Sequence, residues 1–198
     1  MTRAFPAALA LFALASCSEG APTQPEQDSP SSEPTDPQDL FFDNLANLCG
    51  KAFAGRLTSD EAVDADMAGA AMAMHVRTCG DDEIRIPFHV ETADGWDRSR
   101  TWVIRRTDTG LQLKHDHRHQ DGSADAVTNY GGDTEDSGGP QRQSFPVDAE
   151  SIALFQQEGL AASITNIWTV GVTPDQFTYE LRRTGENARL FKVAFDLT

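Results

Sequence analysis

The feature that most constrains the fold of this chain is a series of short segments in which apolar and polar residues alternate. Within residues 83–90, Ile84, Ile86 and Phe88 alternate with basic residues and a proline. This period of two is typical of a β-strand that buries one face and exposes the other. We expect further strands at residues 71–79, 100–106, 111–119, 164–172, 176–183 and 189–197.

Turn-forming pairs such as Asp-Gly and Thr-Gly separate these segments, at residues 94–95, 109–110, 121–122 and 184–185. Seven or eight successive strands without intervening helices predict a mainly β fold, built as an antiparallel meander. The sheet can bury its apolar face by forming a lipocalin-like barrel or a strongly curved sandwich. The consecutive hairpins favour the barrel.

One α-helix is expected before the strands, where Asp39 can cap it and Gly50 can end it. Its apolar residues recur at helical spacing and are Leu40, Phe41, Leu45 and Leu48. Two later segments are less regular. The glycine-rich residues 128–143 are expected to form a long mobile loop, and residues 151–159 fit either a strand or a short helix.

The first 38 residues differ in composition from the rest. Arg3 followed by the apolar residues 7–15 predicts a secretory signal peptide over residues 1–16. This apolar run is shorter than the roughly 20 residues that a membrane-spanning helix needs. Residues 17–38 contain many prolines and acidic residues and predict a disordered spacer. Residues 39–198 remain as a single β-rich domain.

The segment Leu14-Ala15-Ser16-Cys17 resembles the lipobox of bacterial lipoproteins. The resemblance implies that Cys17 becomes the lipid-modified amino terminus and that the protein is attached to a membrane of the cell envelope. Ser18 at the next position implies sorting to the outer membrane, facing the periplasm or the cell surface. The alternative is an ordinary cleaved signal peptide in which Cys17 has no role.

The charge and the remaining cysteines narrow the functional classes. A formal net charge of -15 excludes nucleic acid as a partner, because the phosphate backbone would repel the protein. Cys49 and Cys79 are expected to form a disulfide outside the cytoplasm. A catalytic or metal-binding thiol is the alternative, but neither cysteine belongs to a C-x-x-C motif.

Three histidines cluster at the end of one expected strand. His115, His117 and His119 alternate along it and share a face with the leucines at 111 and 113. Neighbouring imidazoles at this spacing are about 6.5 Å apart, so two of them can reach one Zn or Cu ion. A further ligand would have to come from elsewhere, with His89, Asp97 and Asp125 as candidates. The alternatives are contact with an organic ligand or a structural hydrogen-bond network.

A second candidate site lies in residues 97–102. Arg98 and Arg100 can hold a carboxylate or phosphate, with Trp102 beside them. The alternative is that both arginines pair with acidic side chains of the same domain. The chain has no G-x-S-x-G, H-E-x-x-H or P-loop motif, so binding is expected rather than catalysis.

The domain over residues 42–198 resembles a family of uncharacterised proteobacterial secreted proteins and lipoproteins. The resemblance is carried by residues 47–53, 82–88, 97–102 and 113–119. It implies no activity or cofactor. We therefore expect a lipid-anchored envelope protein that binds a small ligand or supports the envelope. The alternatives are metal binding through the histidines and a protein–protein interaction module.

Overall fold

A computed structural model of the chain describes Met1 and residues 36–198. The expected signal peptide, Cys17 and most of the expected spacer lie outside the described residues. The elements are α1 (Pro37–Ala46), β1 (Ala52–Leu57), the 3-10 helix η1 (Ala62–Met67), β2 (Met72–His75), β3 (Thr78–Cys79), β4 (Glu83–Thr92), β5 (Gly95–Thr107), β6 (Gly110–His117), β7 (Tyr130–Asp133), β8 (Arg142–Pro146), α2 (Ala149–Gln157), the 3-10 helix η2 (Ala161–Thr165), β9 (Ile167–Val172), β10 (Gln176–Arg183), the 3-10 helix η3 (Gly185–Asn187) and β11 (Arg189–Asp196).

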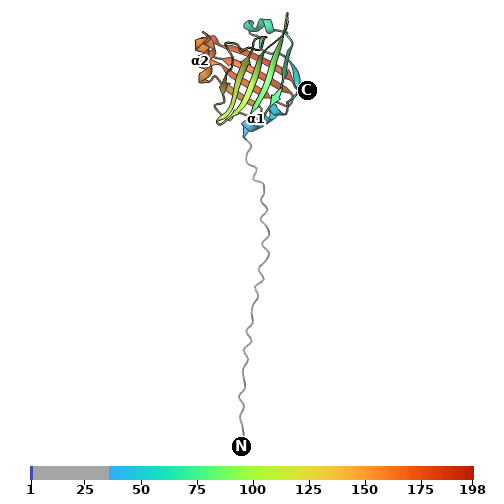
Figure 1. The fold of residues 1–198 in the computed structure, drawn as a ribbon, viewed down its shortest axis with the longest axis vertical. Coiled ribbons are helices and arrows are strands. Elements are labelled where there is room, and N and C mark those ends of the chain that lie inside the picture. Colours follow the sequence, from blue (N-terminus) through green and yellow to red (C-terminus); the bar gives the residue numbers. More distant parts are fainter. Residues whose placement is uncertain (2–35) are drawn as a thin grey trace. The chain divides into compact units, whose positions relative to one another are not determined.

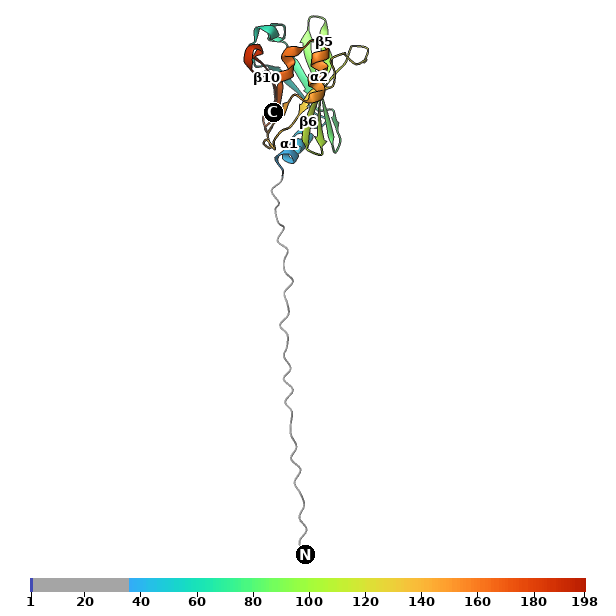
Figure 2. The same cartoon turned by 90° about the vertical axis from the view of Figure 1, so that its left-hand side faces the viewer.

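The strands form one antiparallel sheet that wraps into a nearly closed barrel (Figures 1 and 2). Strands that follow each other in the sequence pair with each other along most of the sheet, and β1 joins its two halves by pairing with both β2 and β11. The two ends of the sheet, β7 and β8, meet at a single bridge between Gly132 and Val147. The predicted mainly β fold is therefore confirmed, and the barrel describes it better than the sandwich.

Glycines allow the two ends of the sheet to meet. At the seam between β7 and β8, a Cβ atom on Gly132 would overlap the carbonyl oxygen of Pro146. On the other side of β7, one on Gly131 would overlap the carbonyl oxygen of Leu113 in β6. Lys114 lies next to this seam, and its ammonium group is 2.9 Å from the carboxylate of Asp148, the residue that caps α2. The seam thus depends on close backbone contact and on a buried ion pair.

Aromatic side chains fill the middle of the barrel. The Trp102 ring stacks on Phe88 at 4.8 Å and on Tyr179 at 4.5 Å, and Phe177 and Phe195 pack around the same indole. This interior is a packed core, and it differs from the open cup of a ligand-carrying barrel.

Helix α1 covers one end of the barrel, the lower end in Figure 1. Phe41, Phe42 and Leu45 are buried in the core. The expected cap at Asp39 is wrong, because the Asp36 carboxylate accepts the Gln38 backbone N–H at 2.7 Å and the helix begins at Pro37. Asp39 instead forms an ion pair with Arg106 on β5.

Four further expectations are corrected by the structure. The helical segment is followed by strand β1, which the sequence did not indicate, and the expected strand at residues 71–79 is divided into β2 and β3. The expected long loop at residues 128–143 contains β7 and the start of β8. The sheet has 11 strands rather than seven or eight. Of the two alternatives for residues 151–159, the short helix is the correct one, because most of these residues lie in α2.

Candidate functional site

The end of the barrel opposite α1 has a polar lining. Here β5 begins and β6 ends, with Arg100 paired in register with His117 and Trp102 paired with His115. The side chains that face the core therefore change from aromatic groups to basic ones over two positions. This end of the barrel, which we call the mouth, contains His115, His117 and Arg100, which the sequence singled out.

His115 is the innermost of these residues and is 3 % exposed. Its Nδ1 lies 3.1 Å from the backbone oxygen of Tyr130, and its Nε2 lies 2.7 Å from the hydroxyl of Tyr179. A carbonyl oxygen only accepts, so Nδ1 carries the proton and Nε2 accepts the hydroxyl hydrogen. Burial lowers the pKa of His115 to about 3, and the ring is neutral at pH 7.

His117 is half-buried at the end of β6. Its Nε2 lies 3.2 Å from the hydroxyl of Tyr130, whose ring also stacks on His115 with centroids 4.7 Å apart. Burial, assisted by the charge of Arg100, lowers the pKa of His117, and burial raises the pKa of Tyr130 to about 12. The mouth therefore contains a connected group of neutral imidazole and phenol side chains.

The third histidine lies outside this group. His119 follows the end of β6, and its Nδ1 is 3.9 Å from the Asp125 carboxylate on the exposed surface. Both ring nitrogens of His115 already have hydrogen-bond partners. Among residues 36–198, no group of three or more His, Cys, Asp or Glu residues is arranged to hold a metal ion. The geometry thus favours the structural network over the metal site.

A groove of about 630 Å³ lies at the rim of the mouth. One wall is the β4–β5 hairpin with Trp96 and Arg98, and the other is the turn after β6 with Arg118 and His119. Asp94 and Asp97 also line it. We call this feature the rim groove.

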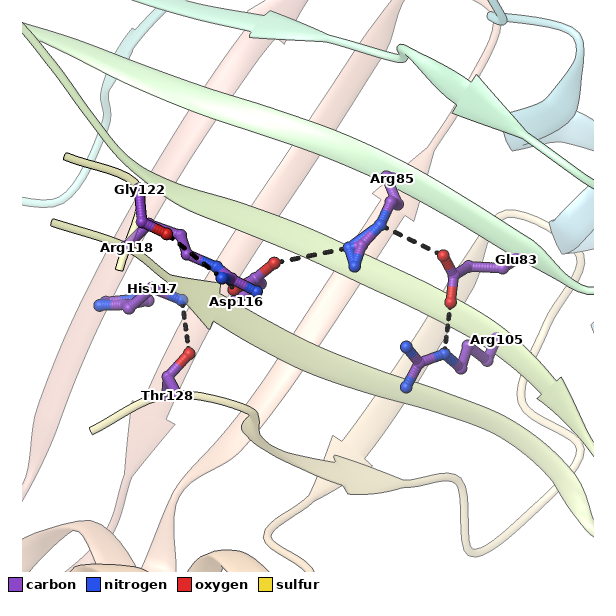
Figure 3. Close-up of polar contacts among 8 residues, drawn as sticks. All are labelled: Glu83, Arg85, Arg105, Asp116, His117, Arg118, Gly122 and Thr128. Atoms are coloured by element: carbon purple, nitrogen blue, oxygen red, sulfur yellow. Dashed lines mark hydrogen bonds and ion pairs between the residues drawn. The ribbon is translucent and has the colours of Figure 1, made fainter. Parts of the chain in front are cut away.

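An outer network of charges fixes the wall that carries Arg118 (Figure 3). The Asp116 carboxylate accepts the Arg118 Nε–H at 2.8 Å and lies 3.5 Å from Arg85, which in turn pairs with Glu83 at 3.2 Å. Arg118 also donates to the backbone oxygen of Gly122 at 3.3 Å, within the turn. Its side chain remains 50 % exposed and accessible from the groove.

The residues predicted to bind an anion are separated by an irregularity in β5. Phe88 of β4 is paired with Arg100 of β5, but Val90 is paired with Asp97, so the register shifts between these two pairs. Arg98 lies within this shift on β5. Arg98 is exposed in the groove and makes no ion pair with any residue that the structure describes. Arg100 pairs with Asp97, and Trp102 lies in the core at 2 % exposure.

Asp97 is therefore neutralised although it lines the groove. Burial alone would raise the pKa of Asp97, but hydrogen bonds from Ser99 and the charge of Arg100 outweigh burial and lower it. Two arginines line the groove: Arg98, which has no ion-pair partner among residues 36–198, and Arg118, which shares the Asp116 carboxylate with Arg85. Sequence reasoning did not indicate that Arg118 and Trp96 line a common groove. The exposure of Trp96 has a signal in the sequence, because it directly follows the Asp94-Gly95 turn of the hairpin.

Comparison of the chain with protein-family models, with curated proteins and with solved structures finds no match. None of the helices described for residues 36–198 is long and apolar enough to cross a membrane. The chemistry of the mouth and the rim groove is therefore the basis for assigning a function.

Proposed function

We propose that this domain binds a small organic anion in the rim groove while a lipid on Cys17 holds it at a membrane outside the cytoplasm. The observation that carries the binding proposal is Arg98, an exposed guanidinium without an ion-pair partner among the described residues. In a chain with a formal net charge of -15, carboxylates are plentiful, so an arginine left unpaired inside a groove is available for a ligand.

The composition of the groove indicates the kind of anion. Arg98 and Arg118 can hold a carboxylate with charge-assisted hydrogen bonds. The indole of Trp96 is 43 % exposed and offers a flat apolar surface next to them. Asp94 disfavours a ligand with several negative charges. We infer a ligand with one anionic group and an aromatic or apolar part.

Replacing Arg98 by glutamine is expected to weaken benzoate binding about tenfold or more, since a hydrogen bond between charged groups contributes about 1.5–3 kcal/mol. Tryptophan fluorescence can measure this. Trp96 is exposed, whereas Trp102 and Trp168 are 2 % and 1 % exposed, so iodide quenches mainly Trp96. Bound benzoate should protect this indole from iodide.

The matched control is Arg56→Gln, which removes an exposed arginine of β1 that pairs with Asp196 away from the groove. It should bind benzoate as the unaltered protein does. Equal affinity in the Arg98→Gln variant, or no protection of Trp96 at millimolar benzoate in the unaltered protein, would refute binding in the rim groove.

The location outside the cytoplasm is supported by the Cys49–Cys79 disulfide, because such bonds persist mainly in oxidising compartments. Together with the lipobox resemblance, it predicts that Cys17→Ala moves the full chain from the membrane fraction to the soluble fraction. Ser18→Ala alters the adjacent residue and should leave the protein with the membranes. Mass spectrometry of the amino-terminal peptide measures the lipid directly. A Cys17→Ala protein that still sediments with membranes would contradict lipid anchoring.

A further inference from the structure

Two arginines face each other at another part of the mouth. Arg183 ends β10 and Arg189 begins β11, and the two residues are directly paired in register. Both belong to the core-facing side of their strands, where Tyr179 and Phe191 are buried closer to the middle of the barrel. The two guanidinium groups are thus brought together above the aromatic core.

A buried carboxylate neutralises the charge of Arg189. Asp64, in the 3-10 helix η1, is buried with a side chain 3 % exposed and forms an ion pair with Arg189. Within residues 36–198, Arg183 has no ion-pair partner. Like charges placed directly opposite each other on adjacent strands are destabilising. Burial and the charge of Arg189 accordingly lower the pKa of Arg183.

Three polar atoms here are buried without a hydrogen-bond partner among the described residues: Nε of Arg183, Nε of Arg189 and Oδ2 of Asp64. Buried donors and acceptors are nearly always paired in folded proteins, and leaving one unpaired costs about 1–3 kcal/mol. The site therefore offers two cationic N–H donors and one acceptor, and the Glu61 carboxylate, which accepts the Leu190 backbone N–H at 3.2 Å, lies beside it.

We propose that Arg183, Arg189 and Asp64 form a binding site for a phosphate group that carries a proton. The two Nε–H groups would donate to phosphate oxygens, and the phosphate hydroxyl would donate to Oδ2 of Asp64. Sulfate is fully deprotonated at neutral pH and has no hydroxyl, so it would leave the Asp64 oxygen unpaired and would repel its charge. The site is distinct from the rim groove, which contains none of these three residues.

The test is thermal unfolding of the protein with inorganic phosphate or sulfate, with sodium chloride holding the ionic strength constant. A ligand that binds the folded state raises Tm. We expect phosphate to raise Tm and sulfate to have a much smaller effect. Titration calorimetry with phosphate should show at least a tenfold loss of affinity in Arg183→Gln.

The matched control is Arg182→Gln. Arg182 is the neighbouring residue on the opposite face of β10 and pairs with Glu180 at 3.0 Å. It should retain phosphate binding. Arg183→Gln removes the repulsion by Arg189 and should fold; Arg183→Lys keeps the charge but not the Nε–H, so it tests the same point if the glutamine variant is unstable.

Phosphate binding that is unchanged in Arg183→Gln and Arg183→Lys would overturn the proposal, as would equal stabilisation by sulfate and phosphate.

Titration with glycerol 2-phosphate distinguishes a phosphorylated molecule from free phosphate as the source of the bound group. Binding of this monoester as well as of inorganic phosphate indicates a site for phosphorylated molecules, and binding of inorganic phosphate alone indicates a site for the free ion. Because Arg98 is not altered in these variants, their benzoate binding tests the rim groove separately.

Discussion

Replacing both Cys49 and Cys79 by serine is expected to lower the free energy of unfolding by about 3 to 4 kcal/mol. The disulfide spans a sequence separation of 30 residues and restricts the unfolded chain accordingly. In the folded protein it connects the turn after α1 to the short strand β3, which pairs with β4. Urea unfolding monitored by circular dichroism measures the difference, and an unchanged spectrum in the absence of urea shows that the fold is retained. The slope against urea should increase, because the unfolded chain without the disulfide exposes more surface.

The control for this prediction is the unaltered protein in a reducing agent. It should unfold at the same urea concentration as the double variant, and the agent should have no effect on the variant itself. A double variant as stable as the oxidised protein would mean that the disulfide contributes little to the attachment of α1. The prediction would then have to be abandoned.

The parts of the fold that the sequence predicted are those with strong local patterns. In β4 the alternating residues Ile84, Ile86 and Phe88 are all buried, as expected from their spacing. His115 likewise shares the core-facing side with Leu111 and Leu113. These properties follow from the geometry of a single strand and need no knowledge of its neighbours.

The parts that were missed depend on pairing between distant segments. Strand β1 has weak alternation, and it is a strand because β2 and β11 pair with its two edges. Strand β7 contains Gly131 and Gly132, which resemble a loop in the sequence. Glycine is needed at these strand positions because a side chain there would overlap the neighbouring backbone. Local propensity argues against strands at such positions, and tertiary packing overrides it.

The candidate sites also combine residues that the sequence indicated with a residue that only the fold brings to them. The sequence placed Arg98 and Arg100 together as a pair, but the register shift in β5 separates them and Asp97 neutralises Arg100. Arg118 joins Arg98 in the rim groove because the turn after β6 lies next to the β4–β5 hairpin. That proximity is a property of the barrel, and no spacing within either segment indicates it.

A second large effect is expected on the free energy of unfolding at acidic pH, and it arises from His115. The pKa of this residue falls from 6.5 to about 3 in the folded protein because of burial. Protonation therefore favours the unfolded state. The stability that this residue contributes is fully present above about pH 6.5 and is lost as the pH falls toward 3, at about 1.4 kcal/mol per pH unit. Over the whole range the loss amounts to about 4 to 5 kcal/mol.

The variant that isolates this effect is His115→Gln. Glutamine can donate to the Tyr130 carbonyl and accept from the Tyr179 hydroxyl, but it does not titrate. Between about pH 5 and pH 6.5, most carboxylates remain ionised, so the slope of unfolding free energy against pH reports mainly on histidines. His89 and His117 also have lowered pKa values and contribute to that slope, and both residues are retained in the variant.

We expect His115→Gln to reduce the average slope between pH 5 and pH 6.5 by about 1 kcal/mol per pH unit, because the unfolded imidazole is only half protonated at pH 6.5 and nearly fully protonated at pH 5. His119→Gln, which removes the exposed imidazole after β6, is the matched control for the substitution itself. The comparison bears on function as well as stability, because a neutral His115 is what allows the polar mouth to rest directly on an aromatic core. If the His115→Gln and unaltered proteins show the same slope, the His115 imidazole is protonated as easily in the folded protein as in the unfolded one. It must then be in contact with water. The packing of Tyr130 and Tyr179 around His115 would have to be more open than the structure shows.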